Sequence, residues 1–140
     1  MNHANIQSVL NEYRQVGVKT GVNDASPHRL VQMLMEGALD RISTAKGNMH
    51  RNEFVDKGRH ISSAISIIDG LRSSLDHERG GQIAQNLDAL YDYMNRRLLE
   101  ANVKNSPEML DEVQHLLGEI KAGWDAIPED VKRAHAEGKL

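Results

Sequence analysis

The sequence predicts an all-α protein, an antiparallel up-and-down four-helix bundle with a short N-terminal amphipathic helical arm. The chain has 140 residues, which is enough for one domain with a hydrophobic core. It holds only 3 prolines and no alternating run rich in threonine and valine, the pattern that favours strands. Four segments of about 20 residues carry apolar side chains at helical spacing, and short turns separate them.

Residues 1–25 are predicted to form an arm and a flexible link. Apolar residues recur at helical spacing near the start of the chain, and they are Ile6, Val9, Leu10, Tyr13 and Val16. The stretch GVKTGVNDA (17–25) interrupts this pattern with two glycines and several polar residues. We therefore expect a small amphipathic helix that is tethered to the bundle, which spans residues 26–127.

The first two bundle helices are expected on either side of a turn at 48–53. Ser26 and Pro27 open the first helix, because serine is a preferred N-cap and proline suits the first helical position. The second helix is predicted over 54–75. Its inward stripe is expected to consist of Ile61, Ala64, Ile65, Ile68, Leu71 and Leu75.

The third and fourth helices are expected after a turn at 76–82. The third is predicted over 82–101, with an inward stripe of Ile83, Leu87, Leu90, Met94 and Leu98. Ser106 and Pro107 repeat the start signal, so the fourth helix is predicted from there to about residue 127. Residues 128–140 are mostly polar and indicate a short helix or a frayed tail.

Composition argues against several classes of protein. The formal net charge of −3 weakly disfavours a nucleic-acid binder. Cysteine is absent, so disulfide and thiol chemistry are excluded, which fits a reducing compartment. The start of the chain lacks the pattern of a signal peptide, and no apolar run approaches the roughly 20 residues of a membrane span. We therefore expect a cytoplasmic protein without membrane insertion.

Metal binding and catalysis have little support in the sequence. A di-metal bundle needs two Glu-x-x-His motifs, and only Glu112 and His115 supply one. These two residues lie beside the apolar stripe, so a surface position is the better interpretation. No serine, histidine or aspartate occupies a strand-turn-helix nucleophile context. We expect no metal, no cofactor and no enzymatic activity.

Surplus apolar and charged residues suggest a partner-binding surface. Ile67 and Tyr93 lie off the main stripes of their helices, and the arm has an apolar face of its own. One interpretation is a groove that receives the amphipathic helix of a partner, and the other is simple deep burial. Arg96 and Arg97 are either solvated or flank such a groove and steer acidic groups of the partner.

Three motifs resemble the flagellar secretion chaperone FliS family. They are ASPHRLVQMLMEGAL (25–39), AISIIDGLRSSLDHERGGQIAQNLDALYDYMNRRLLEAN (64–102) and EVQHLLGEIKAGWDAI (112–127), in that order. The resemblance covers about residues 10–127. It implies a cytoplasmic four-helix bundle that binds the C-terminal segment of new flagellin, prevents early polymerisation and supports delivery to the flagellar type III export gate. It also implies that no cofactor or catalysis is involved.

The resemblance assigns roles to individual residues. Leu10 and Tyr13 match an apolar residue and a tyrosine of the family's N-terminal arm, which implies that the arm borders or covers the client site. The sequence departs from the family's usual pattern at Gly17, Gly21 and Met35. Tyr91 is expected to pack inside the bundle. Tyr93 either faces the partner or the arm, or packs on the edge of a neighbouring helix.

Two alternatives from other classes stay open at this point. A metal-dependent bundle enzyme would require a second Glu-x-x-His motif that the chain lacks. A structural subunit of a larger assembly would associate stably with itself. The chaperone hypothesis instead predicts a one-to-one client complex that replaces any weak homodimer.

Overall fold

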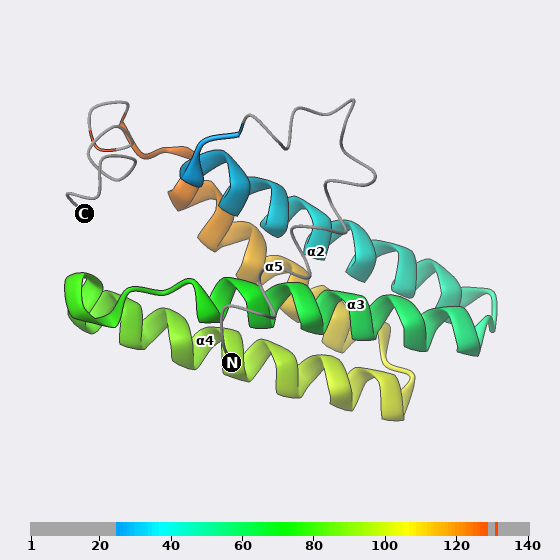
Figure 1. Cartoon of the computed structure of the whole chain (residues 1–140). Coiled ribbons are helices and arrows are strands. Elements are labelled where there is room, and N and C mark those ends of the chain that lie inside the picture. The colour runs from blue at the N-terminus through cyan, green and yellow to red at the C-terminus, as the bar shows by residue number, and fades with distance from the viewer. Residues whose placement is uncertain (1–24, 129–130, 132–140) are drawn as a thin grey trace.

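The computed structural model describes residues 25–128 and residue 131. Four helices make up the regular structure of these residues: α2 (Pro27–His50), α3 (Phe54–Ser73), α4 (His77–Lys104) and α5 (Pro107–Asp125). Consecutive helices run in opposite directions, and α2 and α4 each pack against both α3 and α5 (Figure 1). The predicted all-α bundle is therefore confirmed. The predicted arm, with Leu10 and Tyr13, lies outside the described residues, and the domain limits at 25 and 127 stay predictions.

Both serine–proline pairs start helices in the predicted way. The Ser26 side chain accepts a hydrogen bond of 3.1 Å from the backbone N–H of Arg29, and Pro27 follows it. Ser106 accepts the corresponding bond of 3.3 Å from the N–H of Met109. These caps satisfy N–H groups that have no partner within the helix. The turn predicted at 48–53 begins later than expected, because α2 continues to His50.

One continuous core occupies the centre of the bundle. Its members come from all four helices and are Leu34, Met35, Ala38, Ile42, Ala45, Met49, Ile61, Ala64, Ile67, Ile68, Leu71, Tyr91, Met94, Leu98, Ala101, Leu110, Val113 and Leu117. Tyr91 is among them, as predicted, and burial raises the pKa of its hydroxyl to about 12. This burial keeps the phenol neutral.

Three expectations about side-chain orientation need correction. Ile67 is 2% exposed and belongs to the core, although it was expected off the main stripe. It is buried because α3 packs against two neighbours, so a wider stripe of this helix is covered. Ile83 and Leu90 were expected inward, yet they are 71% and 37% exposed. For Ile83 the reason is a groove that opens beside the first part of α4.

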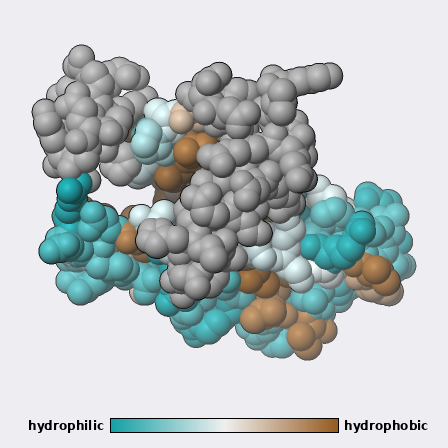
Figure 2. All heavy atoms as spheres, viewed as in Figure 1, coloured by the Kyte–Doolittle hydropathy of each residue, from teal (hydrophilic) through white to brown (hydrophobic). Residues whose placement is uncertain are grey.

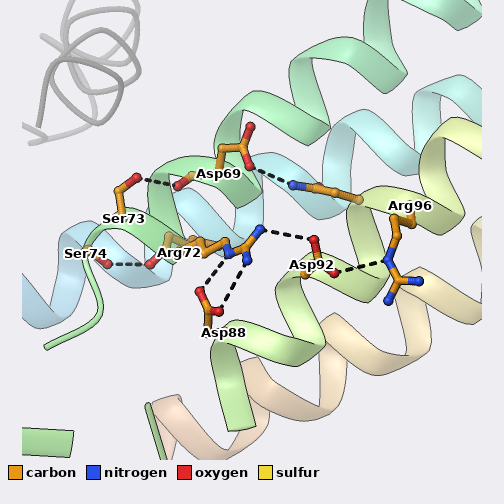
Figure 3. Close-up of polar contacts among 9 residues, drawn as sticks. Asp69, Arg72, Ser73, Ser74, Asp88, Asp92 and Arg96 are labelled. Atoms are coloured by element: carbon orange, nitrogen blue, oxygen red, sulfur yellow. Dashed lines mark hydrogen bonds and ion pairs between the residues drawn. The ribbon is translucent and has the colours of Figure 1, made fainter. Parts of the chain in front are cut away.

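A polar network joins α3 to α4 on one side of the bundle (Figure 3). The guanidinium of Arg72 donates from Nε to Asp88 at 2.6 Å and from a terminal nitrogen to Asp92 at 3.2 Å. About one helical turn before Arg72 in α3, Asp69 accepts a bond of 2.9 Å from the side-chain amide of Asn95. Arg72 holds the pKa of the Asp88 carboxyl below its ordinary value, mainly through this hydrogen bond. The network therefore fixes the register of α4 along α3.

The fold disfavours the charged form of the Asp69 carboxyl. Burial raises its pKa, although the nearby Arg72 lowers it in part. A raised folded-state pKa means that the group stabilises the fold below its unfolded pKa and loses this contribution as pH rises. Asp69→Asn keeps an oxygen that accepts from Asn95 and removes the charge. We expect this variant to be at least as stable as the wild type at neutral pH.

The difference in stability between Asp69→Asn and the wild type should narrow as pH falls towards about 4, because the raised pKa lets the Asp69 carboxyl protonate in the folded protein before it does so in the unfolded chain. Urea unfolding followed by circular dichroism at several pH values measures it. Asp88→Asn is the matched control, because the pKa of Asp88 is lowered and the loss of its charge should destabilise the protein at neutral pH. A destabilised Asp69→Asn variant at neutral pH would contradict the prediction.

Candidate binding groove

An apolar groove of about 700 Å³ lies at one end of the bundle. The start of α2, the end of α3, the start of α4 and the end of α5 meet at this end, because the helices alternate in direction (Figure 1). The described residues that line it are mostly apolar: Pro27, Leu30, Val31, Leu34, Met35, Leu71, Leu75, Ile83, Ala84, Leu87, Tyr91, Ile120 and Trp124. Ser74, Asp76 and Arg79 supply the polar groups of the lining.

Small residues on α4 explain why the groove is not filled. Gly80 and Ala84 face it from the first turns of α4, and neither has the bulk to reach across to α2. Tyr91 lies further along the same helix, where the core closes. Leu30 and Val31 on α2 remain half-buried, and Ile83 is largely exposed. The groove thus presents apolar side chains that the bundle itself leaves uncovered.

The groove has a fixed edge where α5 meets α2. The indole N–H of Trp124 donates a 3.0 Å hydrogen bond to the backbone carbonyl of His28. The rings of the two residues are stacked, with centroids 4.7 Å apart and planes 8° apart. Asp125 accepts from Gln32 at 2.7 Å and pairs with Lys121 at 2.6 Å, and Lys121, followed by Gln32, lowers the pKa of its carboxyl. These contacts hold Trp124 in one orientation at the edge of the groove.

Tyr93 and Arg97 meet on α4, but they face α5 and not the groove. The Tyr93 hydroxyl donates to Glu112 at 2.6 Å, and Nε of Arg97 donates to the other oxygen of the same carboxylate at 2.7 Å. These two bonds lower the pKa of Glu112, with the larger contribution from Tyr93. In this structure Tyr93 therefore packs on the edge of a neighbouring helix, the second of the two predicted arrangements.

Of the remaining predicted residues, Arg96 lies close to Tyr93 and Arg97, whereas Ile67 lies apart from them in the core. Arg96 is exposed and pairs with Asp92 at 3.1 Å, as its spacing along the helix suggests. Its guanidinium and that of Arg97 each lie about 6 Å from the centre of the Tyr93 ring, at 5.9 and 6.0 Å. Ile67 is in the core. None of these four residues lines the groove.

The residues that line the groove were not predicted to form a site. Ile83 and Leu87 were assigned to the core stripe, and Trp124 was assigned to the last helix without a role in a site. The available signal was the pair Gly80-Gly81 directly before Ile83, because small residues leave space beside a large apolar one. Helical spacing alone does not tell a stripe that faces a neighbouring helix from one that faces a groove.

The single Glu-x-x-His motif does not form a metal site. Glu112 is occupied by Tyr93 and Arg97, and His115 is exposed and lies 3.1 Å from Glu119. Within residues 25–128 and 131, no group of three histidine or acidic side chains is arranged to hold a metal ion. In the same part of the chain, none of the helices combines the length and the apolar character that crossing a membrane requires.

A second exposed apolar area lies at the other end of the bundle. Its members are Phe54 and Val55 at the start of α3 and Leu99 and Val103 near the end of α4. The two helix ends are adjacent, because Lys57 of α3 donates to the backbone carbonyl of Asn102 at 3.0 Å. Figure 2 shows separate apolar areas among hydrophilic ones on the face that it draws.

A helical bundle with an apolar groove is a protein suited to hold the apolar face of an amphipathic helix. The sequence pattern of the family described as flagellar protein FliS matches residues 9–131. The chain belongs to this family, as its motifs predicted.

Named relatives cover most of the chain. The flagellar secretion chaperone FliSB of Pseudomonas aeruginosa is 52% identical over 118 residues, which are 84% of this chain and 94% of that protein. The flagellar secretion chaperone FliS of Vibrio cholerae is 46% identical over 121 residues, or 86% and 89% of the two chains. That of Bacillus subtilis is 33% identical over 136 residues, or 96% and 98%. These names describe chaperones and not enzymes, which agrees with the prediction that the chain is not an enzyme.

The contact of Tyr93 with Glu112 predicts a stability effect that depends on pH. Tyr93→Phe removes the hydroxyl that lowers the pKa of Glu112. A lowered carboxyl pKa stabilises the fold above the unfolded value and loses this contribution as pH falls. Tyr93→Phe should therefore melt at a slightly lower temperature than the wild type at neutral pH, and the difference should shrink on acidification below about 4.

Thermal unfolding followed by circular dichroism at several pH values measures this effect. Arg96→Gln is the control, because it removes an exposed ion pair on the same helix and such pairs contribute little. An unchanged melting temperature of Tyr93→Phe at every pH, combined with weaker partner binding, would assign Tyr93 to a partner.

Proposed function

We propose that the protein is a cytoplasmic export chaperone that binds the disordered C-terminal segment of flagellin in the apolar groove. In this role it prevents premature polymerisation of flagellin and supports its delivery to the flagellar type III export gate. The observation that supports the proposal most strongly is the groove itself, with its mostly apolar lining, in a chain that belongs to the FliS family.

The lining suits a helical segment better than a small polar ligand. A small-molecule site combines apolar walls with several convergent polar groups that fix orientation. Here Ser74, Asp76 and Arg79 all belong to the short region between the end of α3 and the first turn of α4. The rest of the lining is apolar, so a ligand would be recognised by its own apolar face. An amphipathic helix provides such a face through residues three and four positions apart.

Such a complex is favourable and still reversible. Burial of the client's apolar face contributes roughly 25 cal/mol per Å² of area removed from water. A segment that is disordered before binding must lose conformational freedom, and this cost offsets much of the gain. A chaperone that has to release its client for export needs this balance. A client that folds on binding therefore fits the proposed role.

The arm and the charged residues have secondary places in the proposal. Leu10 and Tyr13 would border or cover the groove before the client arrives. Tyr93, Arg96 and Arg97 would contact parts of the client that extend beyond the groove, along α4. Ile67 is in the core and has no surface to offer a partner in this conformation.

The groove hypothesis predicts a sharp difference between two exposed apolar side chains of α4. Ile83 lines the groove, whereas Val103 is 86% exposed at the opposite end of the bundle. We expect Ile83→Ser to weaken binding of the flagellin C-terminal segment about tenfold or more, because a buried aliphatic side chain contributes about 1.5–3 kcal/mol. Val103→Ser should bind like the wild type.

Isothermal titration calorimetry with the flagellin C-terminal segment from the same organism measures both variants. One-to-one binding with a negative heat-capacity change and a gain of helix would support binding coupled to folding. Thermal unfolding should show that both variants keep wild-type stability, since neither side chain is buried. If the folded wild type does not bind at micromolar concentrations, the proposal fails, and self-assembly becomes the first alternative.

A further prediction concerns the arm, outside the described residues. Tyr13→Ala should change client affinity far more than melting temperature, because the arm is expected outside the core. Leu98→Ala is the reference for a core substitution, since Leu98 is fully buried and its truncation should cost about 2–5 kcal/mol. Calorimetry and thermal unfolding of both variants test this. A Tyr13→Ala variant that melts as early as Leu98→Ala would make the arm a structural element.

A further inference from the structure

The first turn of α4 is separated from the rest of the helix. Gly81 has φ 51° and ψ −125°, inside a helix that is otherwise continuous from His77 to Lys104. Before it, the Asp76 side chain accepts from the N–H of Arg79 at 3.0 Å, and the N–H of Gly80 donates to the Asp76 carbonyl at 2.7 Å. Residues 76–80 therefore form a capped turn of their own, which we call the lip. In Figure 1 the lip stands out of line with the rest of α4.

The two glycines permit this break for different reasons. The torsion angles of Gly81 lie in a region that residues with a side chain rarely occupy. A Cβ atom at this position would have no heavy atom within 4 Å, so only the backbone opposes a larger residue. At Gly80 the constraint is packing, because a Cβ there would lie 2.8 Å from the Cβ of Ala84. The lip thus rests closely on the next turn of its own helix.

The lip is part of the groove. Asp76, Arg79 and Gly80 line it, followed on the other side of the break by Ile83 and Ala84. Most of the polar side chains that line the groove therefore belong to the lip, and the apolar part of the α4 lining follows Gly81. The backbone angles of Gly81 decide how these two parts of the lining stand relative to each other. A continuous helix would place the lip along the axis of α4 and change the shape of the groove.

We propose that Gly81 is a positioning residue of the groove, which holds the lip in the shape that receives an amphipathic helical segment. This inference rests on the proposed function of the groove. Glycine populates both positive and negative φ, so the chain has access to the broken and the continuous form of α4. An L-residue at position 81 favours the continuous form. The residue at position 81 therefore determines the fraction of molecules with a broken α4, the form whose groove receives the helical segment.

Gly81→Ala tests the proposal. Alanine favours helix interiors over glycine, so α4 should become continuous and helical content should rise slightly. If the receptive form falls to about a tenth of the population, the apparent dissociation constant for the flagellin C-terminal segment rises about tenfold. Trp124, the only tryptophan of the chain, lines the groove, so its fluorescence should change in this variant even without client.

Gly58→Ala is the matched control. Gly58 lies inside α3, its φ is not positive, and a Cβ there would meet nothing within 4 Å. This variant should gain a little stability and keep both wild-type affinity and wild-type tryptophan fluorescence. The comparison separates the effect of the backbone angles at Gly81 from the general effect of alanine in a helix.

D-alanine in place of Gly81 distinguishes positioning from simple crowding. A D-residue favours positive φ, the mirror image of the L preference, so it should hold the broken form and restore wild-type affinity. The chain has no cysteine, so native ligation at an alanine followed by desulfurisation introduces no other change. Crowding by the added methyl group would instead weaken binding with either enantiomer.

The outcomes separate this inference from the proposed function. Weak binding and altered fluorescence with Gly81→Ala, together with recovery by D-alanine, would support the role of Gly81. A wild type that binds the segment and a Gly81→Ala variant that binds equally well would overturn only the role of Gly81. A folded wild type that does not bind would overturn the proposed function, and the inference that depends on it.

Discussion

Close packing of α2, α3, α4 and α5 around one core is the constraint on which the rest of the structure depends. Alanines stand at buried positions of three of these helices, at Ala38, Ala45, Ala64 and Ala101, all fully enclosed. Small residues at such contacts let neighbouring helices approach, and larger ones between them fill the remaining space. The core is complete from Tyr91 towards the end of α4. Towards the start of α4 the small residues Gly80 and Ala84 line the groove. In the core, small residues let helices pack closely, whereas here they leave a space open.

Polar contacts between the helices fix their relative positions and thereby the position of the groove. Arg72 ties α3 to α4, and Glu112 ties α4 to α5 through Tyr93 and Arg97. These groups are partly exposed, so their contribution is to register and orientation more than to stability. The contact of Trp124 with His28 closes the remaining side, between α5 and α2. The helices that line the groove are therefore held in their relative positions by contacts within the bundle.

Much of the fold follows from local signals, whereas the site depends on which helices are neighbours. Ser26 and Ser106 mark helix starts because capping is decided within one turn. Helical spacing also identified most of the core. It was wrong for Ile67 and Ile83 because it records that a face is apolar and not what covers it. The role of Tyr93 depended on Glu112, which is 19 residues away and becomes its partner only once α4 and α5 pack together.

The exposure of Ile83 supports the proposal that the groove receives a partner. A side chain that is 71% exposed gains little from folding, and an apolar surface in water favours aggregation. A serine or glutamine at this position would keep helix α4 and improve solubility. The same argument applies to Gly81, since an ordinary residue would give a regular helix with less conformational freedom in the unfolded chain. Both features run against the stability and solubility of the isolated protein, and both shape one groove, which supports the proposed binding role of this groove.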